Sequence, residues 1–157
     1  MAYQLAEITG GLARDPAGFV AECDQSYQRR LNAAADRILE RMKESPIVLL
    51  SGPSGSGKTT TALKLEQELE RRGVQTHTIS MDNYFKTMNR KTAPRNAEGD
   101  IDYESPQLLD MDLLDETFTK LSRGEWVVVP KFEFARQMRN DSRGTLLKLG
   151  KDEIAIF

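Results

Sequence analysis

The sequence predicts an α/β fold with a mainly parallel sheet, on the evidence of three consecutive segments. An apolar run with β-branched residues at 47–50 is typical of a buried strand, and a helical pattern follows at 60–72. Residues 74–80 then alternate in the manner of a second strand. A strand, a helix and a strand in this order form a βαβ unit, which places both strands parallel in one sheet.

A long amphipathic helix is predicted before the first strand. Asp15 can cap its N-terminus, Pro16 lies in the first turn where proline is tolerated, and Ser45-Pro46 ends it. We therefore expect residues 1–46 to form an N-terminal helical extension. Its apolar stripe is expected to pack against the rest of the protein, with a dimer or partner surface as the alternative. The stripe consists of Phe19, Cys23, Tyr27, Leu31, Ala34, Ile38 and Met42.

A long loop is predicted at residues 86–105. Earlier in the chain, the helix at 60–72 ends before Gly73, since glycine commonly terminates helices, and the second strand follows this glycine. The loop has no periodic pattern, and it carries several lysines and arginines. These cations are either solvated or placed to meet an anionic or polar substrate.

The last third of the chain is expected to hold one helix and three strands. Asp112 is predicted to cap the helix and Gly124 to end it. The strands are expected at 126–129, 146–149 and 154–157, and Pro130 is expected to end the first of them.

The composition excludes several classes of protein. The formal net charge of −2 gives no sign of a nucleic-acid surface. Cys23 is the single cysteine, so no internal disulfide can form, and a reducing compartment such as the cytoplasm is expected. No run of about eighteen apolar residues and no basic-then-apolar leader occurs, so neither a membrane span nor a signal peptide is predicted.

The segment after the first strand carries the most specific chemical signal. It fits G-x-x-x-x-G-K-[ST], the P-loop, in which glycines let successive backbone N–H groups point at one anion. The following helix N-terminus adds further unpaired N–H groups. Lys58 would reach the β- and γ-phosphates, and the Thr59 hydroxyl would ligate Mg²⁺. The predicted ATP-binding residues are Gly52, Pro53, Ser54, Gly55, Ser56, Gly57, Lys58, Thr59 and Thr60.

An acidic residue follows the second strand. Asp82 comes directly after Ser80-Met81, at the carboxyl edge of a parallel sheet, where α/β folds bind ligands. A carboxylate there can accept a proton from an attacking hydroxyl, or hold Mg²⁺ directly or through water. The alternative is an ordinary turn residue. The chain contains no N-K-x-D motif, which argues against a GTPase.

Together with the P-loop, three further motifs resemble the uridine kinase and phosphoribulokinase group of P-loop kinases, from about residue 47 to the end. The motifs are Ser80-Met81-Asp82-Asn83-Tyr84-Phe85, Tyr103-Glu104-Ser105-Pro106 with Asp110, and Val129-Pro130-Lys131-Phe132-Glu133-Phe134 with Arg139. The resemblance implies that residues 47–157 form a P-loop kinase domain built as a three-layer sandwich. It also implies transfer of the ATP γ-phosphate to a ribose 5′-hydroxyl, with Mg²⁺ as cofactor.

The resemblance also assigns roles to single residues. Asp82 matches the catalytic base and, with Thr59, the metal site, while Lys58 matches the catalytic phosphate contact. The implied acceptor site consists of Tyr84, Phe85, Glu104, Phe132, Gln137 and Arg139. In it, Glu104 would hold ribose hydroxyls. Phe132 and Gln137 replace a tyrosine and a histidine that read a pyrimidine, and the order of Tyr84 and Phe85 is reversed. These departures imply a nucleoside-like alcohol rather than uridine in particular.

The family also has further strands, an arginine-bearing lid and an acidic Mg²⁺ contact after the strand that matches 154–157. By the resemblance, residues 47–157 are an incomplete kinase domain. We expect such a chain to bind phosphate weakly and to turn over slowly, because a lid excludes water and supplies cationic charge to the transition state.

Three functions fit the sequence. The first is a P-loop small-molecule kinase whose partners are ATP and a nucleoside-like substrate. The second is a non-catalytic or regulatory nucleotide-binding module. The third is an interaction domain that uses the 16–43 helix and has a vestigial P-loop. A homo-oligomer is compatible with each of them.

Overall fold

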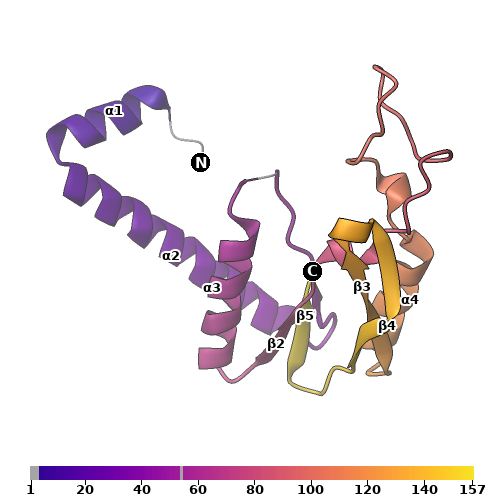
Figure 1. Ribbon diagram of the computed structural model, residues 1–157. Coiled ribbons are helices and arrows are strands. Elements are labelled where there is room, and N and C mark those ends of the chain that lie inside the picture. Colours follow the sequence, from indigo (N-terminus) through magenta and orange to yellow (C-terminus); the bar gives the residue numbers. More distant parts are fainter. Residues whose placement is uncertain (1–3, 54) are drawn as a thin grey trace.

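The centre of the fold is a parallel sheet of three strands in the order β1-β5-β2. Figure 1 shows β5 and β2 next to each other in this sheet. The strands are β1 (Ile47–Val48), β2 (Gln75–Thr78) and β5 (Glu153–Ile156). The computed structural model describes residues 4–53 and 55–157. In the register, Ala155 of β5 lies opposite Ile47 on one side and His77 on the other. The predicted parallel sheet is confirmed, and the last strand of the sequence occupies its middle.

Two helices cover one face of this sheet. They are α2 (Pro16–Arg41) and α3 (Lys58–Arg71), which lie side by side in Figure 1. Between them and the sheet is a core of buried side chains: Leu31, Ala35, Ala62, Leu65, Leu69, Val74, Ile154 and Ile156. The stripe predicted for α2 is confirmed at Leu31, which is buried, and at Ile38 and Met42, which pack against this core. The buried alanine is Ala35, whereas Ala34 is exposed.

The opposite face carries α4 (Met111–Ser122) and the antiparallel hairpin of β3 (Val127–Glu133) and β4 (Met138–Leu147). A second core lies there: Ile79, Tyr84, Leu114, Leu121, Val127, Val129, Leu149, Ala155 and Phe157. Successive residues of a strand point to opposite faces, so Ile154 and Ile156 enter the first core while Ala155 and Phe157 enter the second. This alternation in β5 joins the layers into the three-layer sandwich that the sequence predicts.

An additional helix, α1 (Leu5–Arg14), precedes α2 and was not expected. Figure 1 shows α1 and the first half of α2 projecting away from the sheet. The adjacent glycines Gly10 and Gly11 disfavour helix in a sequence-based prediction. Gly11 is nevertheless required, because a Cβ there would collide with the Phe19 ring of α2. The cap of α2 is as predicted, since the Gly18 N–H donates to Asp15 Oδ1 at 3.0 Å.

Two expectations in the last third of the chain are corrected. The cap of α4 is Asp110, not Asp112, because Asp110 Oδ1 accepts the Leu113 N–H at 3.3 Å. Pro130 does not end its strand, since β3 continues to Glu133. The β3–β4 pairing changes register between Val129 and Lys131, so the residue without an N–H sits where no regular ladder bond is needed.

Strand β4 is also longer than expected, because it begins at Met138 rather than at residue 146. The described part of the chain also contains short 3₁₀ helices at Met81–Tyr84, Pro106–Leu108 and Phe134–Arg136. The 86–105 loop extends above α4 in Figure 1. No helix within residues 4–53 and 55–157 combines the length and the apolar character needed to cross a membrane.

Candidate active site

A cavity of about 420 Å³ lies where the carboxyl ends of the three parallel strands meet. Its wall is formed by the ends of β2 and β5, by the segment that follows β1, and by the start of α3. The lining residues are Leu50, Ser51, Gly52, Lys58, Thr59, Ala62, Thr78, Ile79, Ser80, Met81, Asp82, Ile156 and Phe157. The structure therefore brings Lys58, Thr59 and Asp82 into one cavity, at the edge of the sheet where α/β folds bind ligands.

The loop between β1 and α3 has the backbone conformation that its glycines permit. Gly55 and Gly57 have φ values of 72° and 81°, which side-chain-bearing residues rarely adopt. Gly57 is the N-cap of α3. The exposed loop residues are Gly52, Pro53, Gly55, Ser56, Gly57, Thr59 and Thr60. Ser54, which was also predicted to bind ATP, lies outside the described residues. This geometry suits an anion, because exposed N–H groups of the loop and of the helix start are available to it.

The Lys58 side chain folds back over the loop. Its Nζ donates to the Gly52 carbonyl at 2.8 Å and to the Pro53 carbonyl at 3.0 Å. These two bonds fix the ammonium group beside the loop backbone. A phosphate held by the loop would therefore meet a cation that is already in place.

Asp82 is held on a short, well-defined turn. Ser80 Oγ accepts the Asp82 N–H at 3.3 Å, and the Ser80 carbonyl accepts the Asn83 N–H at 3.1 Å. The Asn83 side chain then accepts the Phe132 N–H of β3 at 3.3 Å. The backbone of the turn is thereby tied to β3, while the Asp82 side chain stays exposed. The sequence gives no separate signal for this role of Asn83, which depends on a partner 49 residues away.

The cavity also suits a magnesium ion. The Thr59 hydroxyl and the Asp82 carboxylate are hard oxygen donors, and both line the cavity. Within the described part of the chain, no three His, Cys, Asp or Glu side chains gather into a metal site. One or two protein oxygens are enough for Mg²⁺, because the phosphates and water supply its remaining ligands.

None of the residues predicted to bind the acceptor lines this cavity. Tyr84 is the clearest departure, since its side chain is fully buried against Phe157, with ring centroids 6.2 Å apart. Burial raises the pKa of its hydroxyl. A side chain with no exposed surface belongs to the core, so the predicted contact of Tyr84 with a substrate would require a conformation in which this side chain is exposed.

Two other predicted residues form an aromatic cluster beside the Asp82 turn. The Phe85 and Phe132 rings meet edge to face at 5.6 Å, and Phe134 meets Phe132 at 5.1 Å. Phe132 is buried, Phe85 is half-buried and Phe134 is exposed. Phe134 was not predicted as a site residue, although it belongs to the same sequence motif. A flat apolar group could stack only on the exposed side of this cluster.

Arg139 is engaged in internal ion pairs. One of its guanidinium nitrogens donates to Asp110 Oδ2 at 2.6 Å, and its Nε lies 2.8 Å from Asp141 Oδ1. The guanidinium beside Asp110 holds the pKa of that carboxyl below its usual value. Since Asp110 also caps α4, Arg139 ties the hairpin to that helix.

The last two predicted residues lie on turns. Glu104 is exposed in the 86–105 loop, where its N–H donates to Asp102 Oδ1 at 3.1 Å. Gln137 joins β3 to β4 with a φ of 51°, and its carbonyl accepts the Met88 N–H at 2.9 Å. The structure thus brings Gln137 to the base of the loop that carries Glu104.

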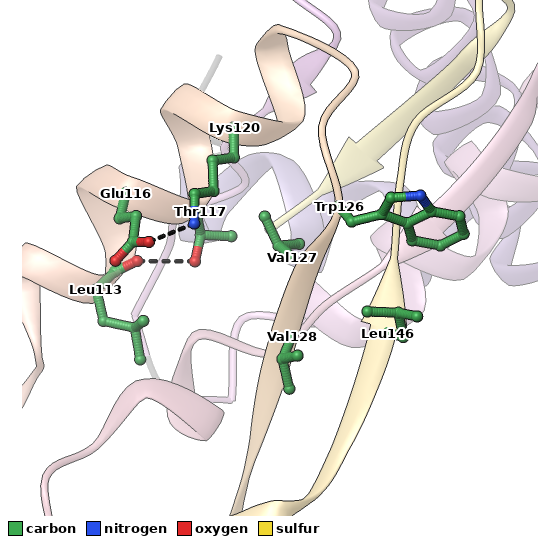
Figure 2. Close-up of a pocket in the computed structure, with 8 residues that line it drawn as sticks. All are labelled: Leu113, Glu116, Thr117, Lys120, Trp126, Val127, Val128 and Leu146. Atoms are coloured by element: carbon green, nitrogen blue, oxygen red, sulfur yellow. Dashed lines mark hydrogen bonds and ion pairs between the residues drawn. The ribbon is translucent and has the colours of Figure 1, made fainter.

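A second cavity, of about 290 Å³, lies between α4 and the hairpin and holds no predicted site residue (Figure 2). Two pairs of its polar groups contact each other: the Thr117 hydroxyl donates to the Leu113 carbonyl at 2.7 Å, and Lys120 Nζ lies 2.5 Å from Glu116 Oε1. Trp126, on the strand side in Figure 2, is largely exposed. Because these two pairs are engaged in internal contacts, the cavity offers few polar groups to orient a ligand.

Comparison with known proteins identifies relatives of the part of the chain that carries the phosphate loop and Asp82. The model of the "Phosphoribulokinase / Uridine kinase family" matches residues 47–151. A uridine kinase of Schizosaccharomyces pombe is 33% identical over 97 residues, which are 62% of this chain and 21% of that protein. A uridine kinase of Staphylococcus aureus is 34% identical over 100 residues, 64% of this chain and 46% of that protein. The chain thus spans less than half the length of either relative.

A solved structure shares the fold. The structure described as a possible uridine kinase from Bacillus stearothermophilus is similar with a TM-score of 0.65 and 20% identity. The similarity covers 83% of this chain and 70% of that one. It confirms the predicted α/β architecture.

Proposed function

The chain belongs to the phosphoribulokinase and uridine kinase family, and on this premise we propose that it is an ATP-dependent phosphotransferase. It would move the γ-phosphate of ATP to a hydroxyl of a nucleoside-like small molecule. The observation that carries the proposal is the shared cavity of Lys58, Thr59 and Asp82. A phosphate cradle and an acid at one sheet edge are the two parts that transfer to an alcohol requires.

In this mechanism the loop amides and the start of α3 bind the polyphosphate, and Lys58 neutralises charge on its β- and γ-phosphates. Asp82 accepts the proton of the acceptor hydroxyl while the oxygen of that hydroxyl bonds to the γ-phosphorus. The bond from that phosphorus to the β,γ-bridging oxygen breaks, and ADP leaves. When bound, Mg²⁺ held by Thr59 and Asp82 would supply further positive charge to the phosphates.

The acceptor is proposed to lie between the Asp82 turn and the exposed side of the aromatic cluster of Phe85, Phe132 and Phe134. Phe85 is three residues from Asp82, so a ring stacked on this side and a hydroxyl near Asp82 could belong to one small molecule. This arrangement supports a planar, nucleoside-like acceptor. In this arrangement, the loop and the hairpin would have to move before Glu104, Gln137 or Arg139 could contact the acceptor.

The alternative is a nucleotide-binding module without catalysis. The observation that favours it is the engagement of Arg139 and Tyr84 in internal contacts, which leaves few polar groups to orient an acceptor. Such a module binds MgATP and transfers no phosphate.

A coupled assay of ADP release, run with nucleosides, pantothenate and sugar phosphates as acceptors, decides between the two. We expect one acceptor class to stimulate ADP release. Asp82→Asn should then reduce the rate by about 10²- to 10⁴-fold, as for a lost general base, while MgATP still binds. Binding of MgATP with no stimulation by any acceptor would favour the non-catalytic module. No binding of MgATP at all would contradict both.

A further inference from the structure

Helix α2 packs directly against α3, the helix that begins at the phosphate loop. Leu31 and Ala35 of α2 are 5% and 0% exposed, and they share a core with Ala62, Leu65 and Leu69 of α3. The family model begins at residue 47, so this support comes from outside the matched segment. The N-terminal extension is therefore in a position to influence the cradle.

One polar contact reaches the first turn of α3. The Tyr27 hydroxyl of α2 lies 2.9 Å from Thr61 Oγ1, in a partly buried position. The Thr61 N–H donates to the Gly57 carbonyl at 2.9 Å and so forms the first helical bond after the loop. Lys64 Nζ lies 4.7 Å from the centre of the Tyr27 ring and holds the ring from the next turn.

The start of α3 gains from this contact with Tyr27 because it lacks the side-chain cap that helix starts usually have. Its N-cap is Gly57, and no side chain caps the exposed N–H groups of the first turn. In an α-helix, residues two apart point about 200° apart. Thr59 lines the nucleotide cavity, and Thr61 meets Tyr27 on the other side. The first turn of α3 thus has the cavity on one side and α2 on the other.

We propose that Tyr27 is a positioning residue for the nucleotide site, acting through Thr61 on the helix start that would bind phosphate. This inference rests on the proposed nucleotide binding and extends it to the N-terminal extension. Tyr27 does not touch the ligand. Its hydroxyl fixes the direction of the first-turn N–H groups, and the bound phosphates depend on that direction.

The far end of α3 offers a matched control. Arg72, at the C-cap of α3, contacts both Asp36 of α2 and Glu68, the latter at 2.6 Å. Asp36→Asn therefore weakens an α2–α3 contact without touching the phosphate end. A general loosening of the two helices would make this variant behave like Tyr27→Phe.

The experiment combines two readouts on the whole chain. The first is hydrogen exchange of the backbone amides of residues 61–63 in nucleotide-free protein, for the wild type, Tyr27→Phe, Thr61→Val, Thr61→Ser and Asp36→Asn. The second is calorimetric titration of the same proteins with MgATP. Tyr27→Phe and Thr61→Val should each speed exchange and weaken MgATP binding by roughly 2- to 12-fold, the range for one lost hydrogen bond.

The double variant Tyr27→Phe/Thr61→Val should bind no more weakly than either single variant, because both remove the same bond. Thr61→Ser keeps a hydroxyl and should restore binding, and Asp36→Asn should bind like the wild type. Unchanged exchange in Tyr27→Phe, additive effects in the double variant, or equal weakening by Asp36→Asn would each overturn the inference. Failure of the wild type to bind MgATP would instead contradict the proposed function, and the exchange data would still decide whether Tyr27 holds the turn.

Discussion

The two sides of the candidate site differ in how ready they are for a ligand. On the phosphate side, the loop and Asp82 are exposed around one cavity, and Lys58 is already held beside the loop. On the acceptor side, Tyr84 is in the core, and Arg139 is paired with Asp110 and Asp141. The phosphate side is formed by continuous backbone, whereas the acceptor side requires separate segments to come together.

This difference has a physical origin. A phosphate is bound mainly by backbone N–H groups, so eight consecutive residues and a helix start can form its site. In the proposed function, an acceptor would be bound by side chains of separate segments: the Asp82 turn, the 86–105 loop and the hairpin. The relative positions of these segments are set by contacts such as Asn83 to Phe132 and Met88 to Gln137.

The strongest test of the phosphate side is Lys58→Ala. If Lys58 stabilises transferred charge, the rate of phosphoryl transfer should fall by about 10²- to 10⁴-fold. The melting temperature should change little, since the lysine's bonds within the described residues go to exposed loop carbonyls. Steady-state kinetics and thermal unfolding measure the two effects, and Lys120→Ala on α4 serves as a control for charge removal. An unchanged rate would show that the Lys58 ammonium group does not stabilise the transferred phosphate.

On the acceptor side, two variants of Tyr84 distinguish a role in the core from a contact with the substrate. Tyr84→Ala should lower the free energy of unfolding by about 3–5 kcal/mol, the range for truncating a large buried aromatic side chain. Tyr84→Phe keeps the packed ring, so the acceptor KM should stay at the wild-type value. Denaturant titration and kinetics measure these quantities. A higher acceptor KM in Tyr84→Phe would mean that the hydroxyl reaches the substrate in another conformation.

The same contrast explains what could be predicted from the sequence. The P-loop, the parallel sheet and the caps at Asp15 and Gly73 follow from patterns within a few residues of each other. Placing Asp82 beside the loop needs only one further rule, that parallel strands end at the same edge. These features depend on local chemistry and a single topological step.

The incorrect expectations depend on tertiary contacts. Helix α1 contains Gly10-Gly11, which disfavours helix locally, and the ring of Phe19 explains why Gly11 must lack a side chain. Pro130 stays within β3 because the register shifts there. Asp110 rather than Asp112 caps α4, and it is also held by Arg139. The Phe19 contact, the register shift and the Arg139 contact cannot be identified from the spacing of residue types, whereas the cap bond of Asp110 to Leu113 is local.

The pair of Asp110 and Arg139 predicts a smaller, pH-dependent effect. Asp110→Asn keeps a capping side chain and removes the charge, so it should cost about 1.5–3 kcal/mol at pH 7, as for a hydrogen bond to a charged group. Arg139 lowers the pKa of Asp110 in the folded state below the usual 3.8. The stabilisation is therefore present above pH 3.8 and is lost as the pH falls through the lower, folded-state pKa.

Unfolding curves of the wild type and Asp110→Asn should consequently converge at low pH. Asp141→Asn is the control, because Asp141 is 66% exposed and its pair with Arg139 should contribute little. A stability difference that persists at low pH would mean that the carboxyl acts through the cap alone.

The smallest effect is expected at Gln137, the one non-glycine residue with positive φ among residues 4–53 and 55–157. Gln137→Gly relieves the left-handed conformation and should raise the free energy of unfolding by up to about 1 kcal/mol. Gln137→Asn, which also tolerates this conformation, keeps a shorter amide. Both variants retain the carbonyl that accepts the Met88 N–H. If the glutamine side chain contacts the acceptor, both should raise the acceptor KM without changing the KM for ATP. If the residue only forms the turn, neither KM should change, and the acceptor side would then depend on the aromatic cluster and Asp82 rather than on this amide.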